Sequence, residues 1–338
     1  MSASAVLDEP LVFERIPLEK VWGGRTLEST LGIPLPTGQK IGETWELCDR
    51  PDRNSIVARG SFRGRSLREL MTEQRERILG RARPSPDGTF PLLVKYLDAT
   101  ANLSVQVHPH RAIAHTLPPG DAPKSECWYL IAAERGSGIW HGVRPGVDPE
   151  KLAAAAAGPG VVSLLSWYRA EPGQFYFVPG GTIHAIGAGV TLVEIQENSD
   201  TTYRLYDWGR MGSDGRPRAT HVDRALRAVR HGSGAKRPRR PYRKGIAHKD
   251  DENKRAECVD AEEFGVDLLE LCDPLEAGTG DVALIYVVLE GGGRIARSDR
   301  GASWSVLAGE TWLVPACLGD HRIEPDGSLR VLQVTTRS

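Results

Sequence analysis

Short runs of apolar and β-branched residues, separated by turns rich in Gly and Pro, recur along most of the 338-residue chain. Such runs are typical of β-strands. The clearest are PLLVKYL, NLSVQVH, ECWYLI, VTLVEIQ, DVALIYVVL, TWLVPA and SLRVLQV. Helix signals are few: residues 66–79 begin with a Ser-x-x-Glu capping box, residues 148–157 begin with Asp-Pro, and residues 223–230 form a third candidate. Many strands and few helices predict a mainly β chain built as barrels or sandwiches.

The charge of the chain is balanced, with a formal net value of −1 at pH 7. We therefore expect no surface for nucleic acid or for a membrane. No apolar run approaches membrane-spanning length, and residues 1–10 lack the basic and apolar regions of a signal peptide. The five cysteines are scattered and never form a Cys-x-x-Cys pair, which is typical of reduced thiols. These features predict a cytoplasmic protein.

One turn sequence would hold a histidine in a fixed position. Residues 173–184 read GQFYFVPGGTIH, so an apolar strand runs into a Pro-Gly-Gly turn and His184 follows at the start of the next strand. A lone histidine in an ordinary hairpin would have no special meaning. A rigid corner, however, fixes the imidazole as a metal site requires.

A second block supplies partners for this histidine. Successive side chains of a strand alternate between faces, so Ser104, Gln106 and His108 of LSVQVHPH share one face. Glu126 opens the strand-like segment ECWYLI. Together with His184, Gln106, His108 and Glu126 would offer two nitrogen and two oxygen donors. This set suits Zn²⁺, and Mn²⁺ or Fe²⁺ would accept it as well.

Several blocks resemble those of the type I mannose-6-phosphate isomerases in their short bacterial form. The resemblance is specific between about residues 11 and 207, and is carried by IGETWELCDRP, FPLLVKYLDA, LSVQVHPH, KSECWYLI, GQFYFVPGGTIHAIG and NSDTTYRLYD. It implies a cupin-type jelly-roll enzyme that holds one Zn²⁺ and interconverts mannose 6-phosphate and fructose 6-phosphate. The large helical insertion of longer family members is absent from this sequence, so residues of that region have no counterpart here.

The resemblance also implies roles for individual residues. The positions that match the metal ligands of the family are Gln106, His108, Glu126 and His184. Arg204 of TTYR matches the active-site arginine, and Lys124, Ser104 and Lys95 match positions near the sugar phosphate. We expect Arg204 and Lys124 to take part in catalysis as well as in substrate binding.

An aldose–ketose isomerase needs a base that moves a proton between C1 and C2, and cationic groups that stabilise the enediolate. We predict Glu194 as the base, because Leu192, Glu194 and Gln196 share one face of the strand VTLVEIQ. Two alternatives stay open: Glu194 is only hydrogen-bonded to a neighbouring strand or to Arg204, or the base is metal-bound water. Arg204 could instead be a structural ion-pair partner of Asp200 or Asp207, but its position in the block NSDTTYRLYD favours the active site.

The C-terminal part repeats the first pattern in a weaker form. Residues 231–244, HGSGAKRPRRPYRK, read as an exposed linker, and the spacing of Gly309, Pro315, Gly319 and His321 resembles the corner before His184. No block like QVH precedes His321, so we expect it to be structural. The prediction is a catalytic jelly roll over residues 1–230 and a degenerate one without metal over residues 231–338, with a few peripheral helices.

Two other classes of function compete with the isomerase. A non-catalytic cupin that binds a sugar would lack the base or the arginine, and a different metal-dependent cupin enzyme would use a ligand set richer in histidine. The sequence has the base, the arginine and a mixed set of ligands. We expect a phosphosugar as the only partner, and a monomer or weak homo-oligomer.

Overall fold

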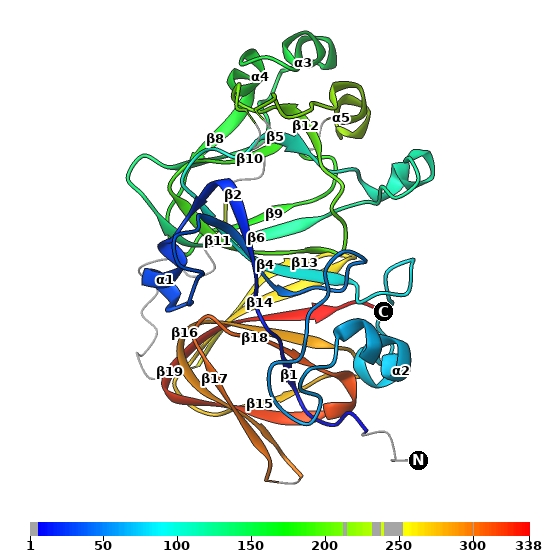
Figure 1. Cartoon of the computed structure of the whole chain (residues 1–338), viewed down its shortest axis with the longest axis vertical. Helices are drawn as coiled ribbons and strands as arrows, with labels where there is room; N and C mark the ends of the chain where they lie inside the picture. Colours follow the sequence, from blue (N-terminus) through cyan, green and yellow to red (C-terminus); the bar gives the residue numbers. More distant parts are fainter. Residues whose placement is uncertain (1–5, 212–214, 232–237, 240–252, 300) are drawn as a thin grey trace.

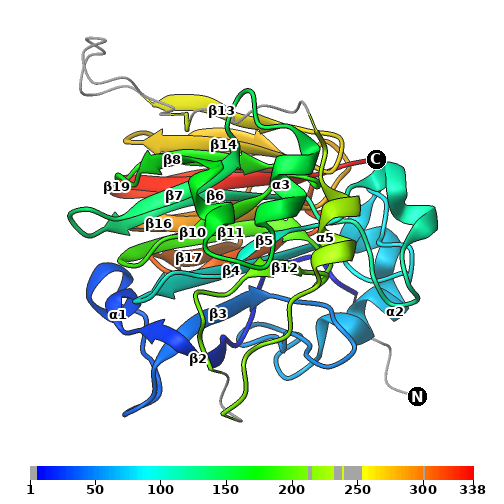
Figure 2. The same ribbon diagram turned by 90° about the horizontal axis from the view of Figure 1, so that it is seen from above.

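The computed structural model describes residues 6–211, 215–231, 238–239, 253–299 and 301–338. Antiparallel sheets dominate these residues, and two β-rich halves lie one above the other (Figure 1). Seen from above, the sheets form layers whose strands run in similar directions (Figure 2). The prediction of a mainly β chain with a few peripheral helices is confirmed. None of the helices within the described part is long and apolar enough to cross a membrane.

The upper half contains two sheets. One has six strands in the order β2 (Ile16–Gly24), β3 (Ile41–Leu47), β4 (Leu92–Ala99), β11 (Val190–Glu197), β6 (Glu126–Ala133) and β9 (Phe175–Val178). The other has five strands in the order β12 (Tyr203–Tyr206), β5 (Val105–Val107), β10 (His184–Ile186), β7 (Gly138–Val143) and β8 (Leu165–Arg169). Apolar residues of both sheets meet between them, among them Trp128, Ile139, Ile186 and Leu192.

The lower half is one eight-stranded sheet. Six strands follow the order β1 (Leu11–Val12), β18 (Thr311–Val314), β16 (Leu284–Arg297), β19 (Asp320–Thr336), β14 (Phe264–Leu271) and β13 (Lys254–Asp260). Two further strands pair at its sides, β15 (Leu275–Gly278) with β19 and β17 (Ser303–Leu307) with β16. The first strand of the chain thus belongs to the sheet formed by its C-terminal part.

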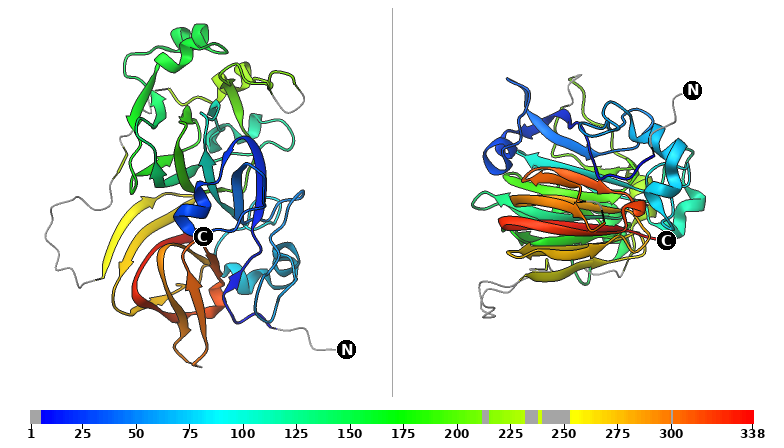
Figure 3. Two further views of the ribbon diagram at one scale, coloured as in Figure 1. Left: turned by 60° about the vertical axis from the view of Figure 1, so that its left-hand side comes forward. Right: turned by 90° about the horizontal axis from the view of Figure 1, so that it is seen from below.

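The N-terminal segment passes along both halves (Figure 3). Leu11 pairs with Leu313, and Gly80 at the end of α2 (Leu67–Leu79) bridges to Val282. One continuous apolar core contains side chains of β4, β6 and β11 together with side chains of β14, β16 and β19. The division at residues 230 and 231 stays a prediction, and most of the predicted linker, residues 231–244, lies outside the described residues.

The helices are short and lie at the periphery. They are α1 (Thr26–Leu31), α2, η1 (Arg111–Thr116), α3 (Pro149–Ala155), α4 (Gly160–Ser163), α5 (Val222–Ala228) and η2 (Ala316–Leu318). The predicted capping box of α2 is present, since Ser66 and Glu69 cap each other's backbone amides. Asp148 caps α3 as predicted, by accepting a hydrogen bond from the backbone amide of Lys151.

Strand alternation divides β11 between two environments. Val193 and Ile195 face the core shared with the lower half, whereas Leu192 packs between the two upper sheets. Glu194, which shares its face with Leu192, is directed towards the space between these sheets. The six-stranded sheet therefore presents polar groups on the face towards the five-stranded sheet. Its opposite face packs against the lower half.

Candidate metal centre and active-site pocket

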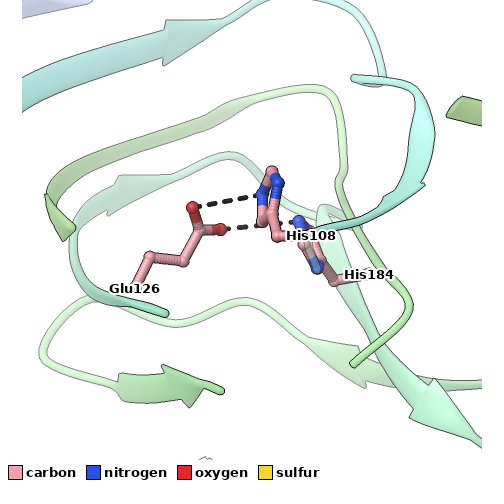
Figure 4. Close-up of side chains that lie close together, drawn as sticks. All are labelled: His108, Glu126 and His184. Carbon is pink, nitrogen blue, oxygen red and sulfur yellow. Dashed lines mark ion pairs between the residues drawn. The ribbon is translucent and has the colours of Figure 1, made fainter. Parts of the chain in front are cut away.

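Three buried side chains meet between the two upper sheets (Figure 4). His108 follows β5, Glu126 is the first residue of β6, and His184 is the first residue of β10. One candidate ligand atom from each lies within 4.8 Å of the others. The oxygens of Glu126 are 3.3 Å from Nε2 of His108 and 3.4 Å from Nε2 of His184. Residues 76 positions apart in the chain are thus brought to one point, as the sequence predicts.

The Pro-Gly-Gly turn places His184 beside His108. Gly181 has a φ of +91°, a conformation that favours glycine, and its backbone amide donates a hydrogen bond to the carbonyl of His108 at 2.7 Å. A Cβ on Gly180 would lie 2.7 Å from the carbonyl oxygen of Pro109. Gly180 is needed because the turn lies directly against the segment that follows His108, and Gly181 because of its backbone conformation.

Each histidine is oriented by a backbone carbonyl. Nδ1 of His108 lies 2.7 Å from the carbonyl oxygen of Thr201, and Nδ1 of His184 lies 2.9 Å from that of Thr182. A carbonyl only accepts hydrogen bonds, so each Nδ1 carries the proton and each Nε2 presents its lone pair to the cluster. Burial lowers the pKa of His184 to about 3, which keeps this ring neutral. Neutral imidazoles with a free Nε2 are suited to bind a metal.

Glu126 supplies the negative charge of the cluster. Its side chain is 1% exposed, and burial acts to raise its pKa, but the charge of Lys124 holds that pKa well below its usual value. Nζ of Lys124 lies 2.7 Å from Oε2. Neither carboxylate oxygen makes a hydrogen bond of good geometry within the described part of the chain. A buried carboxylate with free lone pairs beside two imidazole nitrogens fits a divalent metal ion.

Gln106 lies at the edge of the cluster. It is opposite His184 on one neighbouring strand and opposite Arg204 on the other. Its Nε2 is 3.2 Å from Nε2 of His184, and its Oε1 accepts a hydrogen bond from Ser104 at 2.9 Å. A 180° turn of the side-chain amide would direct the oxygen of Gln106 towards the cluster.

Glu194 lies between two lysines. Its Oε1 is 2.9 Å from Nζ of Lys95 and 3.6 Å from Nζ of Lys124, and its Oε2 accepts a hydrogen bond from Nε1 of Trp128 at 3.0 Å. Lys95 on β4 and Trp128 on β6 are its direct neighbours across the sheet. Burial acts to lower the pKa of Lys95, but Glu194 and Glu43 raise it above its usual value.

The sequence prediction missed Glu43, which extends this row of charges. Glu43 on β3 lies 3.9 Å from Lys95 and 3.2 Å from Lys20, and it accepts a hydrogen bond from Nε1 of Trp45 at 2.8 Å. Although burial opposes it, the lysines lower the pKa of Glu43 to about 2. The block ETWELC contains a usable signal, because Glu43 and Trp45 share one strand face.

An excess of positive charge lies on another side of the pocket. Asp207 pairs with Arg210 and, at 3.5 Å, with Arg218, which leaves three arginines, counting Arg204, around one carboxylate. Burial and the charges of Arg218 and Arg210 lower the pKa of Arg204. Its Nε is buried without a hydrogen-bond partner among the described residues, as are Nε and Nη1 of Arg210. Guanidinium nitrogens without a hydrogen-bond partner are suited to bind an anion.

Neither alternative ion pair predicted for Arg204 is found within the described ranges. Asp200 instead lies 2.8 Å from Arg50, and Asp207 contacts the other two arginines. Glu194 contacts both neighbouring strands of its sheet, through Lys95 and Trp128. His321 has partners at both ring nitrogens, the carbonyl of Gly319 and the hydroxyl of Tyr286, each at 2.9 Å.

One cavity of about 1230 Å³ connects these groups. The predicted site residues that line it are Lys95, Ser104, Gln106, Lys124, His184, Glu194 and Arg204. The remaining two, His108 and Glu126, are 1% exposed and belong to the cluster at its inner end. Lys20, Glu43 and Arg218 also line the cavity. The arrangement combines a metal-type cluster, a row of lysine–glutamate pairs and an anion-binding group.

Comparison with known proteins points to one family. Residues 15–132 match the family described as phosphomannose isomerase type I, catalytic domain. Mannose-6-phosphate isomerase ManA of Bacillus subtilis is 32% identical over 317 residues, which cover 94% of this chain and 96% of that protein. A mannose-6-phosphate isomerase of Streptococcus mutans is 39% identical over 229 residues, which cover 67% of this chain and 70% of the relative.

A solved structure extends the likeness to the whole fold. The mannose 6-phosphate isomerase from Bacillus subtilis superposes with a TM-score of 0.83 at 28% identity, and the match covers 96% of this chain and 99% of that one. The likeness includes the C-terminal half, where the sequence alone gave only a weak repeat of the first pattern. It confirms the predicted cupin-type architecture.

The assignment of His108 and His184 as metal ligands can be tested by measuring the metal content of variants. We expect His108→Ala and His184→Ala to lose most of the metal, because each removes one of the two imidazole nitrogens that face Glu126. His321→Ala is the matched control, since this histidine is buried in the other half and occupied at both nitrogens. Elemental analysis of purified variants measures the result. Full metal stoichiometry in either cluster variant would rule out the assignment.

Proposed function

Because the chain belongs to the type I phosphomannose isomerase family, we propose that it interconverts D-mannose 6-phosphate and D-fructose 6-phosphate. The main structural support is that the buried His/Glu/His cluster, the lysine–glutamate pairs and the arginines adjoin one cavity. A non-catalytic sugar-binding cupin would not need a carboxylate held between two lysines in that cavity.

We assign one metal ion per chain to Gln106, His108, Glu126 and His184. Two imidazoles, a carboxylate and an amide oxygen suit Zn²⁺, and Mn²⁺ and Fe²⁺ accept the same donor types. When bound, the ion acts as a Lewis acid that stabilises negative charge on the sugar oxygens. The carbonyls behind His108 and His184 hold both rings in the orientation that binding needs.

We assign the phosphate group to the arginine side of the cavity. Arg204 and Arg218 line the cavity there. Together with Arg210 they carry three positive charges, and the single negative charge of Asp207 does not balance them. Ser104 offers a hydroxyl on the same strand face as Gln106. Lys95 and Lys124 are each paired with a carboxylate that neutralises their charge. We therefore assign them to contacts with the sugar oxygens rather than with the phosphate.

The proton transfer is assigned to Glu194. Its carboxylate would take the proton from C2 of the aldose and return it to C1, with the hydroxyl proton moving from O2 to O1 in the same conversion. Lys124 lies 3.6 Å from Glu194 and 2.7 Å from Glu126, so its ammonium group adjoins both the base and the metal cluster. That position lets it stabilise charge that develops on the enediolate oxygens.

We propose that the protein is cytoplasmic. All five cysteines are free thiols, which fits a cytoplasmic location. We propose a small phosphosugar as the partner, and a monomer or weak homo-oligomer as the assembly state.

The function is tested with an assay that couples fructose 6-phosphate formation to a dye, on protein of defined metal content. We expect conversion of mannose 6-phosphate, with unphosphorylated mannose at least about a hundredfold poorer in kcat/KM because it leaves the arginines without an anion. Arg204→Ala should remove most of this preference, whereas Arg75→Ala on the exposed face of α2 should keep it. Equal efficiency on both sugars would contradict the assignment.

Proton transfer is tested separately with Glu194→Gln. This change keeps the shape and a hydrogen-bond acceptor for Trp128 but removes the base, so metal content and KM should hold while kcat falls by about 10²–10⁴-fold. Deuterium incorporation at C1 and C2 from heavy water, followed by NMR, should stop. Arg204→Ala keeps the base and should retain slow exchange. Exchange at the wild-type rate in Glu194→Gln would show that another group is the base.

A further inference from the structure

Ser125 connects the metal centre to the C-terminal half. It lies between Lys124 and Glu126, with its side chain on the other side of the chain from theirs, and is 4% exposed. Its hydroxyl donates a hydrogen bond of 2.9 Å to Oε1 of Glu263. Glu263 belongs to the turn between β13 and β14, so the acceptor comes from the lower sheet.

The same serine ties together three segments that carry site residues. Its backbone amide donates to Oε2 of Glu197 at 2.8 Å, and its carbonyl accepts from the amide of Glu197 at 3.0 Å. Its Oγ accepts from the amide of Gly180 at 3.3 Å, and Gly180 opens the turn that leads to His184. Ser125 thus joins the start of β6, the end of β11 and the turn before β10.

We propose that Glu263 is a positioning residue of the metal centre. By accepting the proton of the Ser125 hydroxyl it orients Oγ so that the lone pairs face Gly180, and this fixes Glu126 and His184 relative to each other. The C-terminal half then contributes to metal binding without supplying a ligand. The proposal rests on the metal site assigned above.

The hydrogen bond between Ser125 and Glu263 orients the Ser125 hydroxyl and is not needed to hold the two halves together. Other contacts hold the halves together near it: the ring of Phe264 packs edge-on against Phe177 at 6.3 Å, and both belong to or pack against the shared apolar core. Loss of one hydrogen bond beside this core leaves it in place. A hydroxyl buried next to Glu126, however, would lose the acceptor that sets its direction.

The experiment is a double-mutant cycle on Ser125→Ala, Glu263→Ala and the double variant. Zinc dissociation constants are measured by competition with a chelator, and kcat and KM are measured at saturating zinc. Loss of an outer-shell partner typically costs about 10–100-fold in metal affinity or activity, and we expect that range for each single variant in zinc affinity, with KM unchanged. The double variant should be no worse than Ser125→Ala, because Ser125→Ala already removes the bond to Glu263 together with the one from Gly180.

Two further variants separate positioning from general stability. Glu263→Gln keeps an oxygen acceptor and should restore zinc affinity to within a few-fold of wild type. Glu262→Ala changes the exposed neighbouring carboxylate and should leave it unchanged. The Glu263→Ala and Glu263→Gln pair decides the question even if Ser125→Ala fails to fold.

The outcomes also separate this proposal from the proposed function. Wild-type zinc affinity in Glu263→Ala, or effects that add fully in the double variant, would overturn the positioning role while leaving isomerase activity intact. If the wild type fails to convert mannose 6-phosphate, the proposed function falls, and non-additive losses of zinc affinity would still support the role of Glu263.

Discussion

The burial of two carboxylates between the upper sheets determines how the interior of this half is built. Glu126 and Glu194 are 1% and 3% exposed, and a buried charge without a partner would be strongly destabilising. Lys124 contacts both, and Lys95 contacts Glu194. Removing one member of such a buried pair typically costs about 3–5 kcal/mol, so each lysine has a stabilising role besides any chemical one. The same burial lowers the pKa of His184, which keeps this imidazole neutral beside Glu126, as metal binding requires.

The six-stranded sheet contributes to both the cavity and the apolar core, because successive side chains of a strand point to opposite faces. One face carries the lysines and glutamates of the cavity, and the other packs on the eight-stranded sheet in a single apolar core. The lower half therefore supports the strands that position Glu126 and Glu194 from behind. The hydrogen bond from Ser125 to Glu263 adds a polar contact to this support at the residue next to a proposed ligand.

Much of the site could be predicted from the sequence, because alternation along a strand is a local property. Alternation places Gln106 and His108 on one face, and both side chains contact His184. It also places Glu194 on the face opposite Val193 and Ile195, which belong to the shared apolar core. Arg210 and Arg218 were missed because their approach to Arg204 depends on how the chain folds back after β12. Glu43 shares a strand face with Trp45, but its contact with Lys95 depends on the pairing of β3 with β4, which strand alternation alone does not give. The pairing of β1 with β18, between residues about 300 positions apart, is equally invisible to local patterns.

We propose that residues from both upper sheets hold one metal ion beside the cavity. Anomalous X-ray diffraction from crystals of the zinc-loaded protein tests it most directly. We expect one strong peak per chain, about 2.0–2.2 Å from Nε2 of His108, Nε2 of His184 and an oxygen of Glu126, with the amide of Gln106 turned towards it. A peak at other residues, or a fully loaded protein with no peak between these three side chains, would contradict it.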